Sequence, residues 1–234
     1  GRAEAGHVAL VAGGRVVPLI TNQEYKRAFD GNQGIVAGAP LGGLVERDPD
    51  DRHGLARALI EPLAPWFREV GYRGPVQVTA VRHDGRWHVI EYNVRLGVTS
   101  GPLLLRLLEN PLEVLLAAAR GETPRPRWRR GLRFGASITL AGYGYPYVQI
   151  EGPELPVEVT GPPPPNTWLW WGEVRRDRRG RLRATGHRLL DAAAVARTLP
   201  AALAAAYAAI RQVRVPGAYH RLDIGRSLWP PGAS

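Results

Sequence analysis

The sequence contains no cysteine among its 234 residues. Disulfide bonds and metal sites built from thiolates are therefore excluded, and the composition is compatible with a cytoplasmic protein. No apolar run approaches the length of about 20 residues that a membrane-spanning helix needs, which argues against a membrane protein. No secretory signal is visible at the start of the chain.

Methionine is also absent, and lysine occurs only once, at Lys26. Because an open reading frame starts with Met, we expect a fragment, a processed product, or a sequence whose beginning is missing. The net charge of +10 comes almost entirely from arginine. The abundance of Arg, Ala, Pro and Gly is typical of a genome-wide bias, so this charge fits an anionic small-molecule substrate as well as a nucleic acid. The arginines cluster only at 125–133 and 175–183 and form no motif, which argues against nucleic-acid binding.

Two pairs of β-rich segments are each separated by a short turn. Val8–Ala12 and Arg15–Ile20 flank two glycines, and Val76–Arg82 and Trp87–Asn93 flank an Asp-Gly pair. Both spacings predict β-hairpins. The polar, glycine-rich stretch 21–45 has no sustained period and is expected to be a long loop, which inside a compact domain is usually functional.

Two segments have the spacing of helices. Apolar residues recur every three or four positions in Asp50–Val70, where Pro62 and Pro65 are expected to interrupt the helix. The stretch Pro102–Arg120 also predicts a helix, with a break at Pro111.

The Pro- and Arg-rich stretch 124–130 is the expected domain boundary. We expect an α+β protein with one domain over residues 1–123 and a small β-rich, barrel- or sandwich-like domain over 124–234. The expected strands beyond the boundary are Ser137–Leu140, Val157–Val159, Trp168–Arg175 and Arg181–Gly186, followed by a closing helix over Pro200–Val213.

The strand Arg86–Gly97 carries the most informative polar residues. Glu91 and Asn93 are two positions apart, so on a strand their side chains point to the same face. Two hard oxygen ligands side by side suit Mg²⁺ bound together with nucleotide phosphates. Arg95 continues that face and offers a guanidinium to a phosphate or carboxylate. A solvated strand face is the alternative explanation for the same pattern.

Five segments, taken in order, resemble the C-terminal half of the phosphoribosylamine–glycine ligase (glycinamide ribonucleotide synthetase) family of ATP-grasp enzymes. Together they extend over nearly the whole chain. They are Tyr25–Gly34, Ile90–Gly97, Leu112–Ala119, Gly142–Pro146 and Tyr219–Gly225.

The resemblance implies an ATP-grasp fold and an ATP-dependent ligation of glycine to phosphoribosylamine through a glycyl phosphate, in purine biosynthesis. Glu91 and Asn93 would hold Mg²⁺ against the ATP phosphates. Arg95 would stabilise the acyl phosphate or the substrate phosphate as the catalytic residue. The residues on the substrate side would be Lys26, Arg27, Asp30 and Gly31.

This chain departs from the family pattern at two places. The family carries a Pro-Asn-Thr-Gly-Gly-Met-Gly type loop where this chain has Ile35–Leu41, and it carries Asp-Pro-Glu where this chain has Val98–Ser100. The family's glycine-rich phosphate loop and its amine-binding domain have no counterpart in this chain, so the ligase activity would need an N-terminal half. The alternative is a non-catalytic ATP-grasp-like module that binds a nucleotide or a partner protein.

Overall fold

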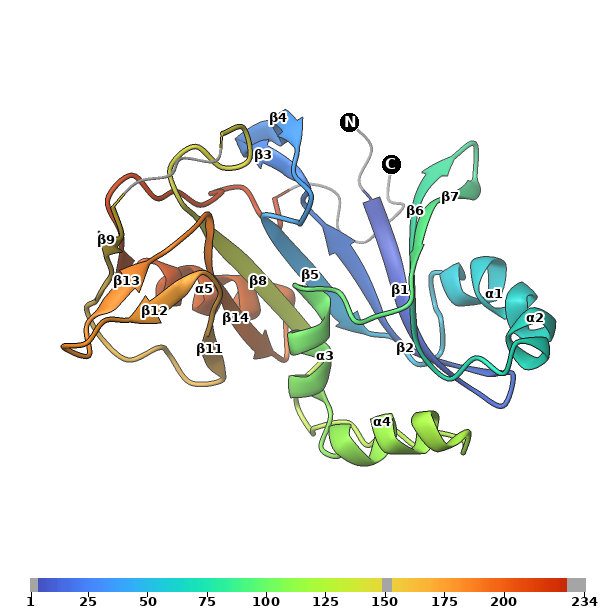
Figure 1. The fold of residues 1–234 in the computed structure, drawn as a ribbon. Coiled ribbons are helices and arrows are strands. Elements are labelled where there is room, and N and C mark those ends of the chain that lie inside the picture. Colours follow the sequence, from blue (N-terminus) through green and yellow to red (C-terminus); the bar gives the residue numbers. More distant parts are fainter. Residues whose placement is uncertain (1–3, 149–152, 227–234) are drawn as a thin grey trace.

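The computed structural model describes residues 4–148 and 153–226, and an eight-stranded antiparallel sheet forms its centre (Figure 1). The strands run in the order β11-β14-β8-β5-β2-β1-β6-β7. Their bounds are β1 (Glu4–Ala12), β2 (Arg15–Glu24), β5 (Gly42–Arg47), β6 (Gly74–His83), β7 (Arg86–Asn93), β8 (Phe134–Ala141), β11 (Thr167–Trp171) and β14 (Arg188–Ala196).

Short strands form three smaller sheets. They are β3 (Arg27–Phe29) with β4 (Gln33–Val36), β10 (Glu158–Val159) with β15 (Val213–Arg214), and β13 (Leu182–Ala184) between β9 (Leu155–Pro156) and β12 (Val174–Arg176). The helices are η1 (Asp30–Asn32), α1 (Leu55–Leu59), η2 (Glu61–Leu63), α2 (Ala64–Glu69), α3 (Ser100–Leu107), α4 (Pro111–Arg120) and α5 (Leu199–Ile210). Among the described residues, no helix is long and apolar enough to cross a membrane.

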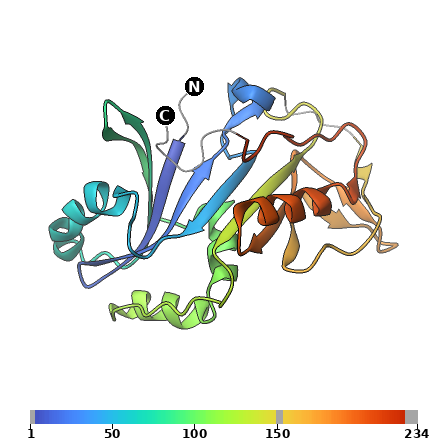
Figure 2. The ribbon, with the colours of Figure 1, turned by 180° about the vertical axis from the view of Figure 1, so that it is seen from behind.

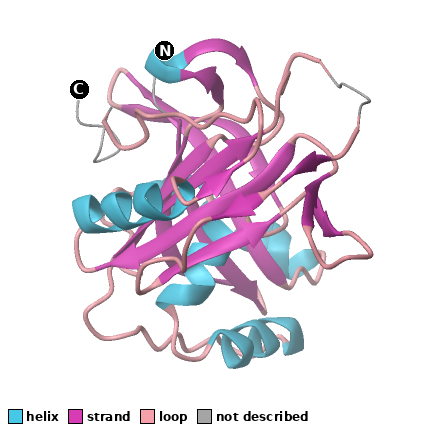
Figure 3. Cartoon of the chain, turned by 90° about the vertical axis from the view of Figure 1, so that its left-hand side faces the viewer, coloured by secondary structure: helices cyan, strands magenta, loops and turns pink. Residues whose placement is uncertain are grey.

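Helices cover both faces of the sheet because its buried strands are apolar on both sides. In β14, Ala192 and Ala194 pack in the core beneath α5, whereas Ala193 and Val195 pack in the core beneath α3 and α4. This follows from the two-residue alternation of a strand. Figure 2 shows α5 lying across the back of the sheet, and Figure 3 shows the strands as one twisted layer with helices outside it.

The same alternation divides the other half of the sheet. Val8 and Leu10 of β1 face the core beneath α3 and α4, while Ala9 and Val11 face the core formed with α1 and α2. Helices α1 and α2 therefore lie on the same face of the sheet as α5, opposite α3 and α4.

The predicted hairpins and helix breaks are confirmed. β1 pairs with β2 and β6 pairs with β7, and both turn residues of each hairpin have positive φ. The first predicted helix is interrupted into α1, η2 and α2 around its prolines, and the second divides into α3 and α4 at Pro111.

One sequence-based prediction of local structure is wrong, and one strand was not predicted. The stretch 21–45 is not one loop, because β2 continues to Glu24 and the buried strand β5 begins at Gly42. Gly43 permits this strand, since a Cβ there would lie 2.7 Å from Thr99 Oγ1. The central strand β14 was not expected at all, because its alanines lack the β-branched side chains that indicate a strand.

The predicted boundary between residues 123 and 124 does not separate two sheets. β8 lies beyond the boundary and pairs with β5, which lies before it, so the main sheet is continuous. The physical reason is that β5 and β8 each bury both faces, and their backbones hydrogen-bond directly. The expectation of a separate β-rich sheet is wrong, whereas the expected α+β class is confirmed.

Candidate functional site

The single lysine of the chain lies among three carboxylates from three different strands. Lys26 Nζ is 2.9 Å from Glu91 Oε1, 3.0 Å from Glu4 Oε2 and 3.7 Å from Glu24 Oε2. Glu4 and Glu24 are paired across β1 and β2, and Glu91 comes from β7 two strands away. The main sheet thus brings together charges that are up to 87 residues apart in the sequence.

The charges of this cluster shift one another's pKa. Burial raises the pKa of Glu24, only partly opposed by the charge of Lys26. The hydrogen bond from Lys26 lowers the pKa of Glu91. Burial lowers the pKa of Lys26, but its hydrogen bonds to Glu91 and Glu4 outweigh this, so its pKa is raised overall. The ammonium group is therefore held charged.

Glu91 and Asn93 lie beside a polar row on the neighbouring strand. Asn93 is paired with Gln77 of β6, and a hydrogen bond from the Asn93 side chain also lowers the pKa of Glu91. Gln77 Nε2 donates to Glu24 Oε1 at 3.0 Å, and Gln77 Oε1 accepts from Ser100 Oγ at 3.1 Å. The beginning of α3 thereby positions the amide next to the carboxylate cluster.

Arg95 follows the end of β7 and is exposed. Its Nη1 lies 3.4 Å from the carbonyl oxygen of Leu96, and its charge also lowers the pKa of Glu91. Glu91 therefore lies between two cations, Lys26 and Arg95, while its side chain remains 46% exposed.

The other three sequence-predicted residues contact a different part of the chain. Arg27 donates to a main-chain carbonyl of its own loop at 2.8 Å. Asp30 Oδ1 accepts from the backbone N–H of Leu222 at 2.8 Å, and the N–H of Gly31 donates to Asp223 Oδ2 at 2.9 Å. The structure thus brings Lys26 to Glu91, whereas Arg27, Asp30 and Gly31 are engaged within their loop or with the segment 219–225.

Arg221 fastens that segment to the loop. Although it is only 1% exposed, its guanidinium binds both carboxylate oxygens of Asp223, at 2.8 and 2.7 Å. It also donates to the carbonyl of Arg27 and to Asn32 Oδ1, each at 3.0 Å. Two of its hydrogen bonds thus reach the 27–32 loop, and the other two hold Asp223, which in turn accepts from the backbone N–H of Gly31.

The sequence analysis missed Glu24 and Gln77. The signal for Glu24 was local, because it follows Asn22 by two positions and so shares the face of a strand. The prediction of a loop over 21–45 concealed that alternation. Gln77 has no local signal, since its role depends on the pairing of β6 with β7.

The side-chain oxygens of Glu91 and Asn93 are suited to bind a hard divalent cation. Mg²⁺ prefers oxygen ligands and commonly takes one or two from the protein and the rest from phosphates and water. Glu91 and Asn93 supply such oxygens, and Glu4 and Glu24 add negative charge nearby. The ammonium of Lys26 lies against the same carboxylate, which shows that this position stabilises a positive charge.

The sheet and its helices are shared with solved structures. The chain matches phosphoribosylamine–glycine ligase from Thermotoga maritima with a TM-score of 0.78 and 27% identity, over 95% of this chain and 56% of that one. It matches biotin carboxylase from Campylobacter jejuni with a TM-score of 0.62 and 13% identity, over 94% and 47%. At 13% identity, the match to biotin carboxylase shows only that the two proteins share a fold. The fold is that of the C-terminal part of ATP-grasp enzymes.

Sequence comparison shows which ATP-grasp proteins the chain resembles. Residues 136–227 match the family model described as "Phosphoribosylglycinamide synthetase, C domain". The phosphoribosylamine–glycine ligase of Corynebacterium ammoniagenes is 31% identical over 96% of this chain and 53% of its own length. That of Caulobacter vibrioides is 30% identical over 95% and 53%. The chain is a relative of the phosphoribosylamine–glycine ligases, and it spans about half the length of the curated relatives it matches.

Proposed function

We propose that this chain forms one wall of the ATP site of a carbon–nitrogen ligase that joins glycine to phosphoribosylamine, or to a related amine, in purine biosynthesis. The observation that carries the proposal is the cluster of Lys26 with Glu4, Glu24 and Glu91, beside Asn93 and Arg95. The relatives at about 30% identity support it.

In this proposal Glu91 and Asn93 hold the Mg²⁺ of Mg-ATP. When bound, the ion reduces charge repulsion during phosphoryl transfer. Arg95, which is exposed beside Glu91, stabilises the anionic phosphate of the activated glycine. Lys26, which pairs with Glu91 here, would with Mg²⁺ on Glu91 be left to Glu4 and Glu24 and could bind substrate from their side.

Arg27, Asp30 and Gly31 remain the proposed substrate-side residues. They lie next to Lys26 in the sequence, and Arg27 and Asp30 are exposed. The anchoring of their loop by Arg221 supports this role, because a fixed loop can present a cation to a ribose phosphate without first being ordered. We expect the complete site to include an N-terminal half, on the same or another chain, and to act in the cytoplasm.

A second candidate function is a non-catalytic module that binds a nucleotide or a partner protein. Two apolar residues at the departures from the family pattern favour it: Ile35 is 44% exposed and Val98 is 45% exposed. Exposed apolar side chains at a substrate-facing position are suited to a different ligand or a protein surface.

Calorimetric titration of Mg-ATP tests the proposal that the ATP site is divided between this chain and an N-terminal half. We expect weak or no binding to residues 1–234 alone, because two protein ligands leave the metal dependent on phosphate contacts from elsewhere. Adding the N-terminal half of the Thermotoga maritima relative should restore binding, and Glu91→Ala should remove it again. Binding at micromolar concentration or below by this chain alone would show a self-sufficient site and contradict the proposed division.

A further inference from the structure

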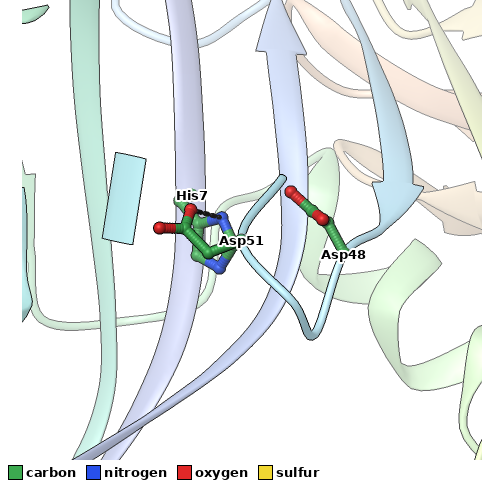
Figure 4. A group of neighbouring side chains, drawn as sticks. All are labelled: His7, Asp48 and Asp51. Carbon is green, nitrogen blue, oxygen red and sulfur yellow. Dashed lines mark ion pairs between the residues drawn. The ribbon is translucent and has the colours of Figure 1, made fainter. Parts of the chain in front are cut away.

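A second polar cluster lies on the opposite face of β1 from Lys26. His7 projects from β1, and Asp48 and Asp51 project toward it from the loop after β5 (Figure 4). All three are buried, with exposures of 0%, 1% and 5%. One donor atom from each lies within 4.8 Å of the donor atoms of the other two.

Thr21 connects two members of this cluster. Its hydroxyl donates to Asp48 Oδ2 at 2.7 Å, and its oxygen lies 3.1 Å from His7 Nδ1. The other ring nitrogen of His7, Nε2, is buried and has no hydrogen-bond partner within the described part of the chain. The hydrogen bonds therefore leave the polar capacity of the imidazole incompletely used.

Asp51 has a buried carboxylate that, among the described residues, forms no ion pair with a lysine or arginine. Its oxygens accept from the backbone N–H groups of Ala56 and Arg57 at 2.9 and 2.7 Å, which caps the start of α1. Oδ1 also lies 3.6 Å from His7 Nδ1.

The charges around the cluster do not balance. The three buried carboxylates of this region are Glu46, Asp48 and Asp51, whereas in the described part of the chain two arginines, Arg52 and Arg133, pair with them. Leaving the imidazole groups aside, one negative charge has no partner. A buried charge of that kind is costly unless a cation compensates it.

We propose that His7, Asp48 and Asp51 bind a divalent transition metal ion such as Zn²⁺, at a site separate from the Mg²⁺ site. Tetrahedral ligands about 2.0–2.2 Å from Zn²⁺ lie about 3.4 Å apart, close to the 3.6 Å between His7 Nδ1 and Asp51 Oδ1. To bind the ion through Nδ1, His7 would move the proton that Nδ1 shares with Thr21 to Nε2, which within the described residues is free to carry it. An imidazole nitrogen with carboxylate oxygens suits Zn²⁺ rather than Mg²⁺.

The position of the site indicates a structural role. The ligands come from β1 and from the loop that leads into α1, and Thr21 of β2 lies between them. An ion there would join α1 to the centre of the main sheet. Three protein ligands leave the fourth position of a tetrahedral ion to a water molecule, and the burial of all three ligands keeps that position away from bulk solvent and substrates.

Titration of the metal-stripped chain tests the proposal. Zn²⁺ followed by calorimetry should bind with one ion per chain and raise the melting temperature. Co²⁺ in its place should give the visible absorption of a nitrogen- and oxygen-ligated ion. Asp48→Asn and His7→Gln should each weaken binding at least tenfold, whereas His83→Gln, which alters a half-exposed histidine paired with Asp84, should leave it unchanged.

Circular dichroism of each variant establishes that it is folded before its metal binding is compared. Asp48→Asn keeps an acceptor oxygen for Thr21 and decides the matter if His7→Gln does not fold. Absence of stoichiometric Zn²⁺ binding by the wild-type chain would overturn the proposal and identify a metal-free hydrogen-bond network. Binding that persists unchanged in both folded variants would overturn it equally.

Discussion

Lys26 connects three strands through its hydrogen bonds and ion pairs with their carboxylates. Its side chain is 15% exposed and that of Glu24 is 7% exposed, so solvent screens this pair little. Glu4 and Glu91 are more exposed, at 24% and 46%. The lysine is therefore important both for the cohesion of the sheet and for the electrostatics of the proposed site.

Replacing Lys26 by methionine should lower the free energy of unfolding by about 1–3 kcal/mol at pH 8, because Glu24 is left buried without a cation. The loss should shrink at pH 5, since burial already raises the pKa of Glu24 and the lone carboxyl group protonates more readily. Urea denaturation at both pH values measures this. Lys26→Arg, which keeps the charge, should retain most of the stability, and an equal loss at both pH values would contradict the explanation.

Single residues of the site differ in how far the sequence predicts them. Glu91 and Asn93 could be recognised because the alternation of one strand places them together. The contact of Lys26 with Glu91 could not, since it depends on strand order across 65 residues of chain. The burial of Arg221 could not be predicted, because an arginine in a polar segment is usually exposed.

At the scale of elements, local signals predicted turns and helix breaks well. Glycine pairs and Asp-Gly demand positive φ, and proline removes a hydrogen-bond donor, so each acts within a few residues. β14 and β5 were missed because their strand character comes from their neighbours in the sheet. The alanines of β14 form a strand because its backbone pairs with β8 and β11, and their small side chains pack in the cores on both faces of the sheet.

The end of β5 is connected to β8 and to the loop before α1 through Glu46. Its carboxylate pairs with Arg52 and with Arg133 Nη2, the latter at 2.8 Å. Burial raises the pKa of Glu46, but hydrogen bonds from His53, Arg52 and Arg133 outweigh this and lower it from 4.5 to about 2. The ionised carboxylate thus stabilises these elements above the unfolded-state pKa.

We expect this contribution to be complete above about pH 4.5 and to be lost as the pH falls toward 2, because the folded-state pKa is the lower one. Glu46→Gln should lower the free energy of unfolding at pH 6 by about 1–2 kcal/mol, after allowing for screening at its half-exposed arginines. Urea denaturation from pH 6 to pH 3 should show the two proteins converging. A difference that stays constant over this range would contradict the assignment.

At the scale of the whole molecule, the continuous sheet and the segment 219–225 connect the two parts of the chain. The segment returns to the 27–32 loop through Arg221 and Asp223, nearly 200 residues away in sequence. Sequence reasoning placed a boundary near residue 124 because the composition changes there. It could not show that β8 pairs with β5 across that point.

Arg221→Met should lower the free energy of unfolding by about 3 kcal/mol or more, because Asp223 and two acceptors of the 27–32 loop lose a buried guanidinium. Hydrogen exchange of residues 27–34 should become faster at the same time. Arg226→Met removes an exposed arginine directly after the segment 219–225 and should change neither quantity appreciably. Unchanged exchange in Arg221→Met would show that the loop is fixed by other contacts.

The central claim is that the Lys26–Glu91 cluster belongs to a glycine-activating ligase. The most direct measurement is ADP formation by a chimera in which residues 1–234 replace the matching half of the Corynebacterium ammoniagenes relative. We expect ADP only when glycine and phosphoribosylamine are both present. Glu91→Ala should abolish it with a stability loss within about 1 kcal/mol, because that carboxylate is half-exposed, while Glu113→Ala, at an exposed acid of α4, should leave it unchanged. ADP formation that persists in Glu91→Ala, or a chimera that binds Mg-ATP without glycine-dependent turnover, would contradict the account.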